Sequence, residues 1–396
     1  MGRTRETVEV ASERLARLIE DEQRTKPKAA KDGDVLPTVD AITCEWLTDV
    51  LCGKANGTEV IDFEITLVSA GTHARHRLQV TYNQEADGTN LPTSLFTKTL
   101  PTVENRMMVG ITGHARTEGG FYTQLRPELE LEIPSCYHST VDRESCAAIH
   151  ILEDLVATKG ATFTNYETYV TREMAEDMVD LLAGLHGHFY NDPRFENAFK
   201  WVAPFTRWFM GGVTKLRVDR STELALTQAA DHIPQRLLAR RDDIWPATLN
   251  ALKLHDEQPE TFLHSDVHIG NWYQTNKGRM GLCDWQCAGR GHWSRDLAYA
   301  ISGALRIEDR RTWEKELVRR YLFRLEEVSG QSFDYEEAWM FYRQQMFHAL
   351  LNWTPTLCPS EHIPATMQTE EMSLTMIERM TAAIDDLDSI DSFKAL

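Results

Sequence analysis

Residues 262–273 read FLHSDVHIGNWY and place His264, Asp266, His268 and Asn271 within eight positions, between apolar and aromatic flanks. Two kinds of chemistry would need this density of polar groups. The pattern His-x-Asp-x-His is typical of ligands to a metal ion in a hydrolase. An aspartate followed five residues later by an asparagine is typical of the catalytic loop of a phosphotransferase. The sequence on either side distinguishes the two.

Downstream of this stretch, NWYQT, NKG and RMGLCDW predict a strand, a turn and a second strand that ends at Asp284. The oxygens of Asn271 and Asp284 are hard ligands that suit Mg²⁺. A hydrolase would need further histidine or aspartate ligands in similar clusters. His292 and the pair His255 and Asp256 show no helical or strand spacing that would serve this purpose.

Upstream, residues 58–155 carry strand and turn signals around one main helix, which predicts a small sheet. Lys98 lies in the apolar strand TSLFTKTL (93–100), where a buried lysine is costly unless it is paired. Glu118, in the helical segment 114–129, is a suitable partner. A single glycine, Gly71, lies between two strand-like runs, where a loop that covers a nucleotide belongs.

The chain beyond residue 160 is predominantly helical. Long helical segments are predicted over 220–241, 308–328, 334–353 and 370–388. A further helix is predicted near the N-terminus over 5–24.

A phosphoryl-transferring enzyme must hold an anionic triphosphate still and neutralise its charge. This chain offers a lysine, a partner acid, metal ligands and a catalytic carboxylate in a workable order.

The composition of the 396 residues is that of a globular protein, with 42% hydrophobic residues. The net charge of −18 argues against a nucleic-acid partner, because such proteins carry a basic surplus. The sequence contains no run of about 18 apolar residues, so no membrane span is predicted. The charged N-terminus lacks the apolar core of a signal peptide, which predicts a cytoplasmic protein. The seven scattered cysteines predict no disulfide framework. The sequence leaves the oligomeric state open.

The combined motifs resemble a known group of proteins. HSDVHIGN (264–271), LCDWQ (282–286) and SRDLAY (294–299) resemble the aminoglycoside phosphotransferase and choline kinase group of the protein-kinase-like superfamily. ITCEWL, EGGFY, ILEDL and FDYEEAWMFYRQQMFHALL are more similar to the ecdysteroid-kinase-like branch and its bacterial relatives. Ser265 departs from the usual pattern, which has glycine at this position.

The resemblance implies an α+β, two-lobed protein-kinase-like fold. Residues 1–41 would form an N-terminal helical extension, and residues 42–155 a small nucleotide-binding β-sheet lobe. Residues 156–396 would form a larger, mostly helical lobe that carries the catalytic loop and the substrate site. ATP would be the phosphoryl donor and Mg²⁺ the metal ion.

For the nucleotide, the resemblance implies that Lys98 contacts the phosphates and pairs with Glu118. Gly71 is the candidate for the covering loop. Glu153 and Leu155, at the end of the strand ILEDL, would offer main-chain groups to adenine.

For the chemistry, the resemblance implies that Asp266 orients the acceptor hydroxyl and accepts its proton. Asn271 and Asp284 would bind Mg²⁺, His264 would brace the loop, and Asp296 would support it from the next helix. The segment after Asp284 is shorter than a protein kinase needs, which favours a small-molecule acceptor.

The sequence therefore predicts an ATP- and Mg²⁺-dependent transfer of the γ-phosphate to a hydroxyl of a small molecule. The acceptor stays open among aminoglycosides, amino alcohols, macrolides, sugars and steroid-like alcohols. One alternative is a catalytically inactive binding protein of the same fold. The other is a metallohydrolase that uses His264, Asp266 and His268.

Overall fold

The computed structural model describes residues 7–53, 57–86, 88–213, 215–361 and 368–395. Within these residues the chain divides into two compact units. Unit 1 comprises the described residues up to Leu129, together with Ile133–Ala161 and Asp284–Gln286. Unit 2 comprises Glu130–Glu132, Thr162–Cys283 and the described residues from Cys287 onward.

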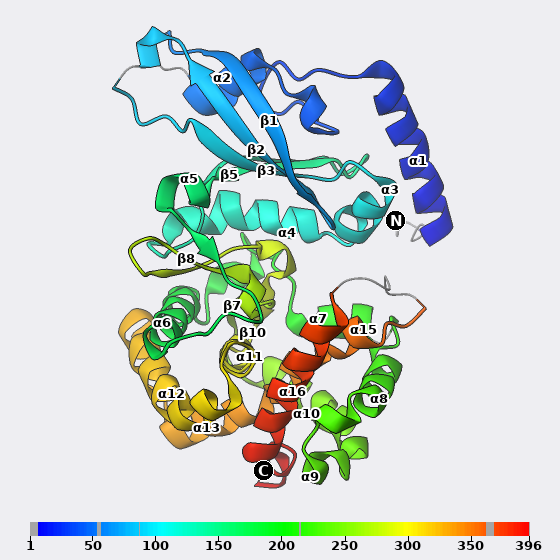
Figure 1. The fold of residues 1–396 in the computed structure, drawn as a ribbon, viewed down its shortest axis with the longest axis vertical. Helices are drawn as coiled ribbons and strands as arrows, with labels where there is room; N and C mark the ends of the chain where they lie inside the picture. Colours follow the sequence, from blue (N-terminus) through cyan, green and yellow to red (C-terminus); the bar gives the residue numbers. More distant parts are fainter. Residues whose placement is uncertain (1–6, 54–56, 87, 214, 362–367, 396) are drawn as a thin grey trace. The chain divides into compact units, whose positions relative to one another are not determined.

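An antiparallel sheet forms the centre of unit 1 (Figure 1). Its strands, five among the described residues, follow the order β1-β2-β3-β5-β4. They are β1 (Val60–Ala70), β2 (Ala74–Tyr82), β3 (Ser94–Thr99), β4 (Cys136–Val141) and β5 (Ala148–Glu153). Side chains alternate between the two faces of a strand. Leu95 of β3 therefore joins an apolar cluster with Trp46 of α2 (Cys44–Cys52), whereas Lys98 faces the helix on the other side.

One interrupted helix follows β3. It consists of α3 (Val103–Asn105), η3 (Arg106–Ile111), α4 (His114–Gly120), η4 (Phe121–Leu125) and η5 (Arg126–Glu128). The helix was predicted over 114–129 but begins at Val103, because the hydroxyl of Thr102 caps it by accepting from the N–H of Asn105. η3 and η4 are π-helical turns on either side of α4, which carries Glu118. Such turns are frequent at functional sites.

Helix α1 (Val8–Thr25) belongs to unit 1 and corresponds to the helix predicted over 5–24, of which residues 5 and 6 lie outside the described residues. Its Glu22 forms an ion pair with Arg106, at 2.9 Å from Nη1 to Oε1 and 2.6 Å from Nη2 to Oε2. The Arg106 side chain is fully buried and also donates to the carbonyl oxygens of Leu100 and Ser145. Arg106 thus joins α1 to the start of the helix that carries Glu118.

Unit 2 is mostly helical. Its helices include α6 (Arg172–His188), α7 (Phe205–Trp208), α8 (Val218–Gln228), α9 (Gln235–Leu238), α10 (Ile244–Glu257), α11 (Ser294–Ala304), α12 (Ile307–Ser329), α13 (Tyr335–Gln344), α14 (Met346–Leu351), α15 (Thr354–Leu357) and α16 (Glu370–Asp386). The segment 220–241, predicted as one helix, is divided: α8 ends at Gln228, a 3-10 turn follows over Ala230–His232, and α9 begins after Pro234.

Short strands in unit 2 hold the motif-bearing segment. They are β6 (Thr162–Phe163), β7 (Thr261–Leu263), β8 (Trp272–Gln274), β9 (Met280–Leu282) and β10 (Gly289–Gly291). β7 pairs with β10, and β8 lies between β6 and β9. The loop 264–271 connects β7 to β8. The predicted α+β class, with an N-terminal sheet and a helical C-terminal region, is confirmed. Among the described residues, no helix combines the length and apolar character needed to cross a bilayer.

Candidate active site

Lys98 is the centre of a buried charge cluster in unit 1. Its Nζ lies 2.7 Å and 2.8 Å from the two carboxylate oxygens of Glu118 and 3.0 Å from Oδ1 of Asp284. Burial disfavours the ammonium, but the carboxylates of Asp284 and Glu118 outweigh it and raise the pKa of Lys98. Lys98 is therefore a cation with a fixed position.

Asp284 lies between two cations. The second is Arg75, whose Nη2 is 3.7 Å from Oδ2. Burial disfavours the ionised carboxyl, but Lys98 and the other neighbouring cations lower the pKa of Asp284 well below its usual range. Its φ of +66° lies in the left-handed region, where residues other than glycine are strained. Asp284 is an ionised carboxylate in a costly backbone conformation.

The residue after Asp284 ties this segment to the helix of Glu118. The ring of Trp285 stacks on that of Phe121, with centroids 3.8 Å apart and planes within 9°. Phe121 lies three residues after Glu118, on the same helical face. Asp284 and Glu118 are thus held together by an aromatic contact as well as by Lys98.

Gly71 lies in the tight turn between β1 and β2. Its N–H donates to the carbonyl of His73 at 3.0 Å, and its carbonyl accepts from Nδ2 of Asn105 at 2.7 Å. Both main-chain groups of Gly71 are therefore used within unit 1. The predicted covering turn thus connects two strands of the sheet, and the N–H of its glycine is bonded within the turn.

Glu153 and Leu155 lie at the end of β5. Glu153 is opposite Leu95 of β3, three residues along β5 from His150, which is level with Lys98. The N–H of Glu153 donates to the carbonyl of Ser135 at 2.9 Å. Leu155 begins α5 (Leu155–Lys159). The two predicted adenine contacts thus share unit 1 with Lys98 but lie at another level of the sheet.

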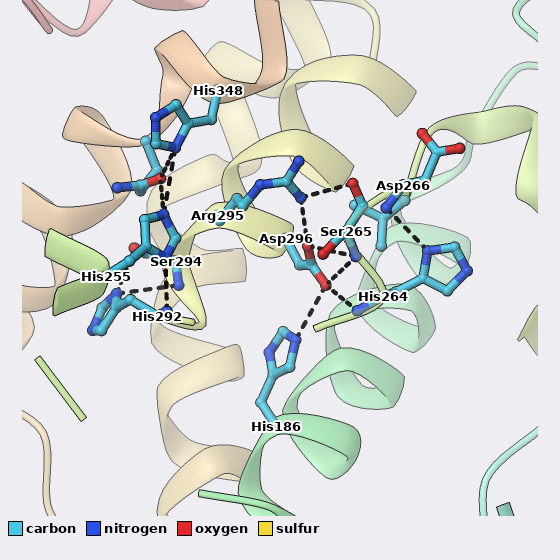
Figure 2. A network of polar contacts seen from close by, with 12 residues as sticks. His186, His255, His264, Ser265, Asp266, His292, Ser294, Arg295, Asp296 and His348 are labelled. Atoms are coloured by element: carbon cyan, nitrogen blue, oxygen red, sulfur yellow. Dashed lines mark hydrogen bonds and ion pairs between the residues drawn. The ribbon is translucent and has the colours of Figure 1, made fainter. Parts of the chain in front are cut away.

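In unit 2, Asn271 is fixed by Asp266. The amide Nδ2 of Asn271 donates to the main-chain oxygen of Asp266 at 2.8 Å and lies 3.4 Å from its Oδ2. This commits the amide nitrogen, so that the amide oxygen is the atom left to act as a metal ligand. The Asp266 side chain keeps 28% of its exposure. Figure 2 shows its carboxylate pointing away from the buried network below it.

The backbone before Asp266 is strained and held from both sides. Ser265 has φ +68°, in the left-handed region that glycine tolerates best. The buried Asp296 carboxylate of α11 accepts from the N–H of His264 at 2.7 Å and from that of Ser265 at 3.2 Å. The guanidinium of Arg295 donates to the carbonyl of Ser265 at 2.7 Å (Figure 2). Two adjacent residues of one helix thus clamp the strained peptide.

The two histidines of the loop have other partners than a metal ion. Nδ1 of His264 accepts from the N–H of Asp266 at 3.2 Å, and its Nε2 lies 2.9 Å from the carbonyl oxygen of Cys283. Nδ1 of His268 accepts from the N–H of Gly270 at 3.1 Å. In the described part of the chain, no three His, Cys, Asp or Glu side chains are grouped to hold a metal. This geometry does not favour the metallohydrolase.

Comparison with known proteins identifies the family. Residues 112–338, more than half of the chain, match the phosphotransferase enzyme family. The chain belongs to this family. The predicted phosphotransferase group is therefore confirmed, whereas the narrower ecdysteroid-kinase-like branch stays a prediction. Among curated proteins, none matches the sequence of this phosphotransferase.

Solved structures that resemble this phosphotransferase are distant in sequence. Choline kinase from Cryptosporidium parvum is 10% identical, with 84% of this chain and 90% of that chain covered and a TM-score of 0.48. An aminoglycoside phosphotransferase from Alicyclobacillus acidocaldarius is 11% identical, with 88% of this chain and 96% of that chain covered and a TM-score of 0.47. Ethanolamine kinase from Plasmodium vivax is 12% identical, with 81% of each chain covered and a TM-score of 0.45.

Two further residues support the loop before Asp266. His186 of α6 is fully buried, with its Nδ1 2.7 Å from the hydroxyl of Tyr321 and its Nε2 3.5 Å from Oδ2 of Asp296. Arg295 directly precedes Asp296 in the sequence, and this adjacency to a predicted supporting residue was the available signal for its role. The hydrogen bond from Arg295 to the carbonyl of Ser265 joins residues 30 positions apart, which only the fold brings together.

Proposed function

We propose that this phosphotransferase moves the γ-phosphoryl group of ATP to a hydroxyl group of a small molecule. The observation that carries the proposal is the fixed, charged Lys98, held by both oxygens of Glu118 and by Asp284. An ammonium that stays protonated in a buried position is suited to binding phosphate oxygens. Glu153 and Leu155 are our proposed main-chain contacts for adenine, and Gly71 marks the proposed covering turn.

Mg²⁺ fits the oxygen donors that the chain offers. Asp284 is an ionised carboxylate that keeps 19% of its exposure, and Asn271 has its amide nitrogen engaged elsewhere. We propose these two residues as the protein ligands, since Mg²⁺ is usually bound by one or two such groups together with water and substrate phosphates. When bound, the ion would supply positive charge to the phosphates.

Asp266 is the proposed catalytic residue. Its carboxylate would orient the acceptor hydroxyl and take its proton. The acceptor oxygen forms a bond to the γ-phosphorus while the bond from that phosphorus to the oxygen of ADP breaks. Because the transition state is largely dissociative, orientation of the nucleophile is the main contribution of Asp266. The clamp from Asp296 and Arg295 on the preceding peptide keeps that orientation.

The chain after Asp284 supports a small acceptor. Trp285 is bound by Phe121, and β10, only five residues after Asp284, pairs with β7. A protein kinase needs a longer activation segment here to bind its protein substrate. We therefore place the acceptor among small hydroxylated molecules.

The proposal is tested by incubating the purified protein with ATP, Mg²⁺ and a panel of amino alcohols, aminoglycosides, macrolides, sugars and sterols. We expect one class of acceptor to be phosphorylated, with an equal amount of ADP, as detected by mass spectrometry. The Asp266→Asn variant, purified and incubated identically, is the control. Absence of Mg²⁺-ATP binding by the wild-type protein would contradict the proposal.

A further inference from the structure

Arg75 and Lys98 form a pair of cations at one level of the sheet in unit 1. They are direct partners in the ladder between β2 and β3, and both side chains reach the Asp284 carboxylate. Directly opposite residues of an antiparallel pair project to the same face. Asp284 therefore has one cation at each of its oxygens.

The two cations differ in how far they are committed. Lys98 makes hydrogen bonds of 2.7–3.0 Å to Glu118 and Asp284, and its side chain is 5% exposed. Arg75 lies 3.7 Å from Asp284, a charge contact too long for a hydrogen bond, and is 25% exposed. A guanidinium carries five N–H donors in a planar fork that matches phosphate oxygens. Arg75 thus retains the donors and the access that Lys98 has given up.

In the adjacent turn, neither the N–H of Gly71 nor the imidazole of His73 serves a phosphate. The N–H of Gly71 is bonded to His73, whereas backbone cradles for phosphates need N–H groups directed at the anion. The imidazole of His73 is fully buried, and burial together with Lys98 lowers its pKa well below the usual value, so His73 is neutral. Arg75 is the next residue of this turn region with a permanent charge.

We propose that Arg75 binds the triphosphate of the nucleotide directly, as a second cation beside Lys98. This inference rests on the proposed function, because it assigns a further residue to the same nucleotide. Arg77, two residues along β2, provides the contrast. Its Nε lies 2.7 Å from Oδ2 of Asp154, a carboxylate that also accepts from Ser94, so its role is structural.

The experiment measures dissociation constants for Mg²⁺-ATP, Mg²⁺-ADP and adenosine with the full chain. Arg75→Gln is expected to weaken Mg²⁺-ATP binding about 10- to 100-fold, the range for a charge-assisted hydrogen bond to phosphate, and to leave adenosine within about twofold. Arg75→Lys keeps the positive charge but loses the planar set of donors. Its dissociation constant for Mg²⁺-ATP should lie between those of the wild type and Arg75→Gln. Arg77→Gln carries the same charge change on the same strand and should show no selective loss for ATP. Thermal unfolding of each variant checks the fold.

The outcomes separate this inference from the function on which it rests. A selective loss of ATP over adenosine in Arg75→Gln supports it. If the wild type binds Mg²⁺-ATP and Arg75→Gln binds it equally well, Arg75 is not a phosphate ligand. An equal loss for ATP and adenosine would show that Arg75 acts only on the fold. A wild type that binds adenosine but not Mg²⁺-ATP would overturn both the proposed function and this inference.

Discussion

In unit 1 the important groups are charged side chains that hold one another, whereas in unit 2 they are main-chain groups held by buried side chains. Lys98 is positioned by the carboxylates of Glu118 and Asp284. The loop before Asp266 is positioned by a carboxylate and a guanidinium that bind peptide groups of Ser265. The first arrangement depends on charge, and the second depends on backbone conformation.

This difference has consequences for how each region tolerates change. A charged cluster should respond strongly to neutral substitutions of nearly equal size, because each cation stabilises the charge of its neighbours. A strained loop should respond to substitutions that alter the preferred φ, even where no charge changes.

Asp284→Asn should have the largest effect. Asparagine keeps the size of the side chain and tolerates the left-handed backbone, so the fold should persist. The loss of the proposed metal ligand should lower phosphoryl transfer about 10³-fold or more, because a metal ion supplies several kcal/mol of transition-state stabilisation. Turnover of ATP with an excess of acceptor measures it. Asp388→Asn, at another left-handed aspartate with φ +46°, is the control and should leave turnover unchanged.

Asp266→Asn should come next. It removes the charge of the proposed catalytic carboxylate and keeps one oxygen, so kcat should fall roughly 10²–10⁴-fold while the affinity for ATP changes by a few fold. Steady-state kinetics and ATP titration give the two numbers. His268→Ala should cost far less, because His268 bonds to Gly270 within the loop. If Asp266→Asn and His268→Ala lost equal activity, Asp266 could not be distinguished as catalytic from His268 as a bracing residue.

The pair Lys98 and Glu118 should show strong coupling. Lys98→Ala should weaken nucleotide binding more than Glu118→Ala, and the double variant should cost less than the sum by about 0.5–3 kcal/mol, because the residues act as one unit. A double-mutant cycle on ATP affinity measures this coupling. The exposed pair Arg324 and Glu327 is the matched control, and its cycle should show no measurable coupling. Strict additivity at Lys98 and Glu118 would contradict a charge-held cluster.

Ser265→Gly should have the smallest effect, and its sign is informative. Glycine adopts φ +68° without steric cost, so the variant should be neutral or more stable by up to about 1 kcal/mol. Ser332→Gly, in an exposed loop before α13, has no such strain and should destabilise instead. Denaturant unfolding of both variants provides the comparison. A clear loss of stability in Ser265→Gly would show that the serine side chain matters more than its backbone.

Part of this arrangement could be predicted from residues that are close in sequence. The spacing from Asp266 to Asn271 and the strand ending at Asp284 were visible as local patterns. The cost of burying Lys98 called for an acid, and Glu118 does contact it, although its function stays a proposal. The β-strands on either side of Gly71 were predicted from their alternation of apolar and polar residues.

The rest depends on register and on chain reversals, which local patterns do not contain. Arg75 lies opposite Lys98 only because the turn between β1 and β2 and the pairing of β2 with β3 fix that register. Asp284 reaches Lys98 although they are 186 positions apart. The left-handed backbone of Ser265 could not be inferred from a residue that rarely adopts it. The resemblance to the motif of the family, in which glycine is usual at this position, was the one available signal.

The ion pair between Glu22 and Arg106 ties the first helix to the helix that carries Glu118. A shortened protein that lacked residues 1–41 would keep every motif by which a phosphotransferase is recognised. It would also leave a fully buried guanidinium without its carboxylate, at the start of the helix that carries Glu118. Anyone who trims this chain for crystallisation or display should therefore treat α1 as internal to the domain and place any tag before Thr7.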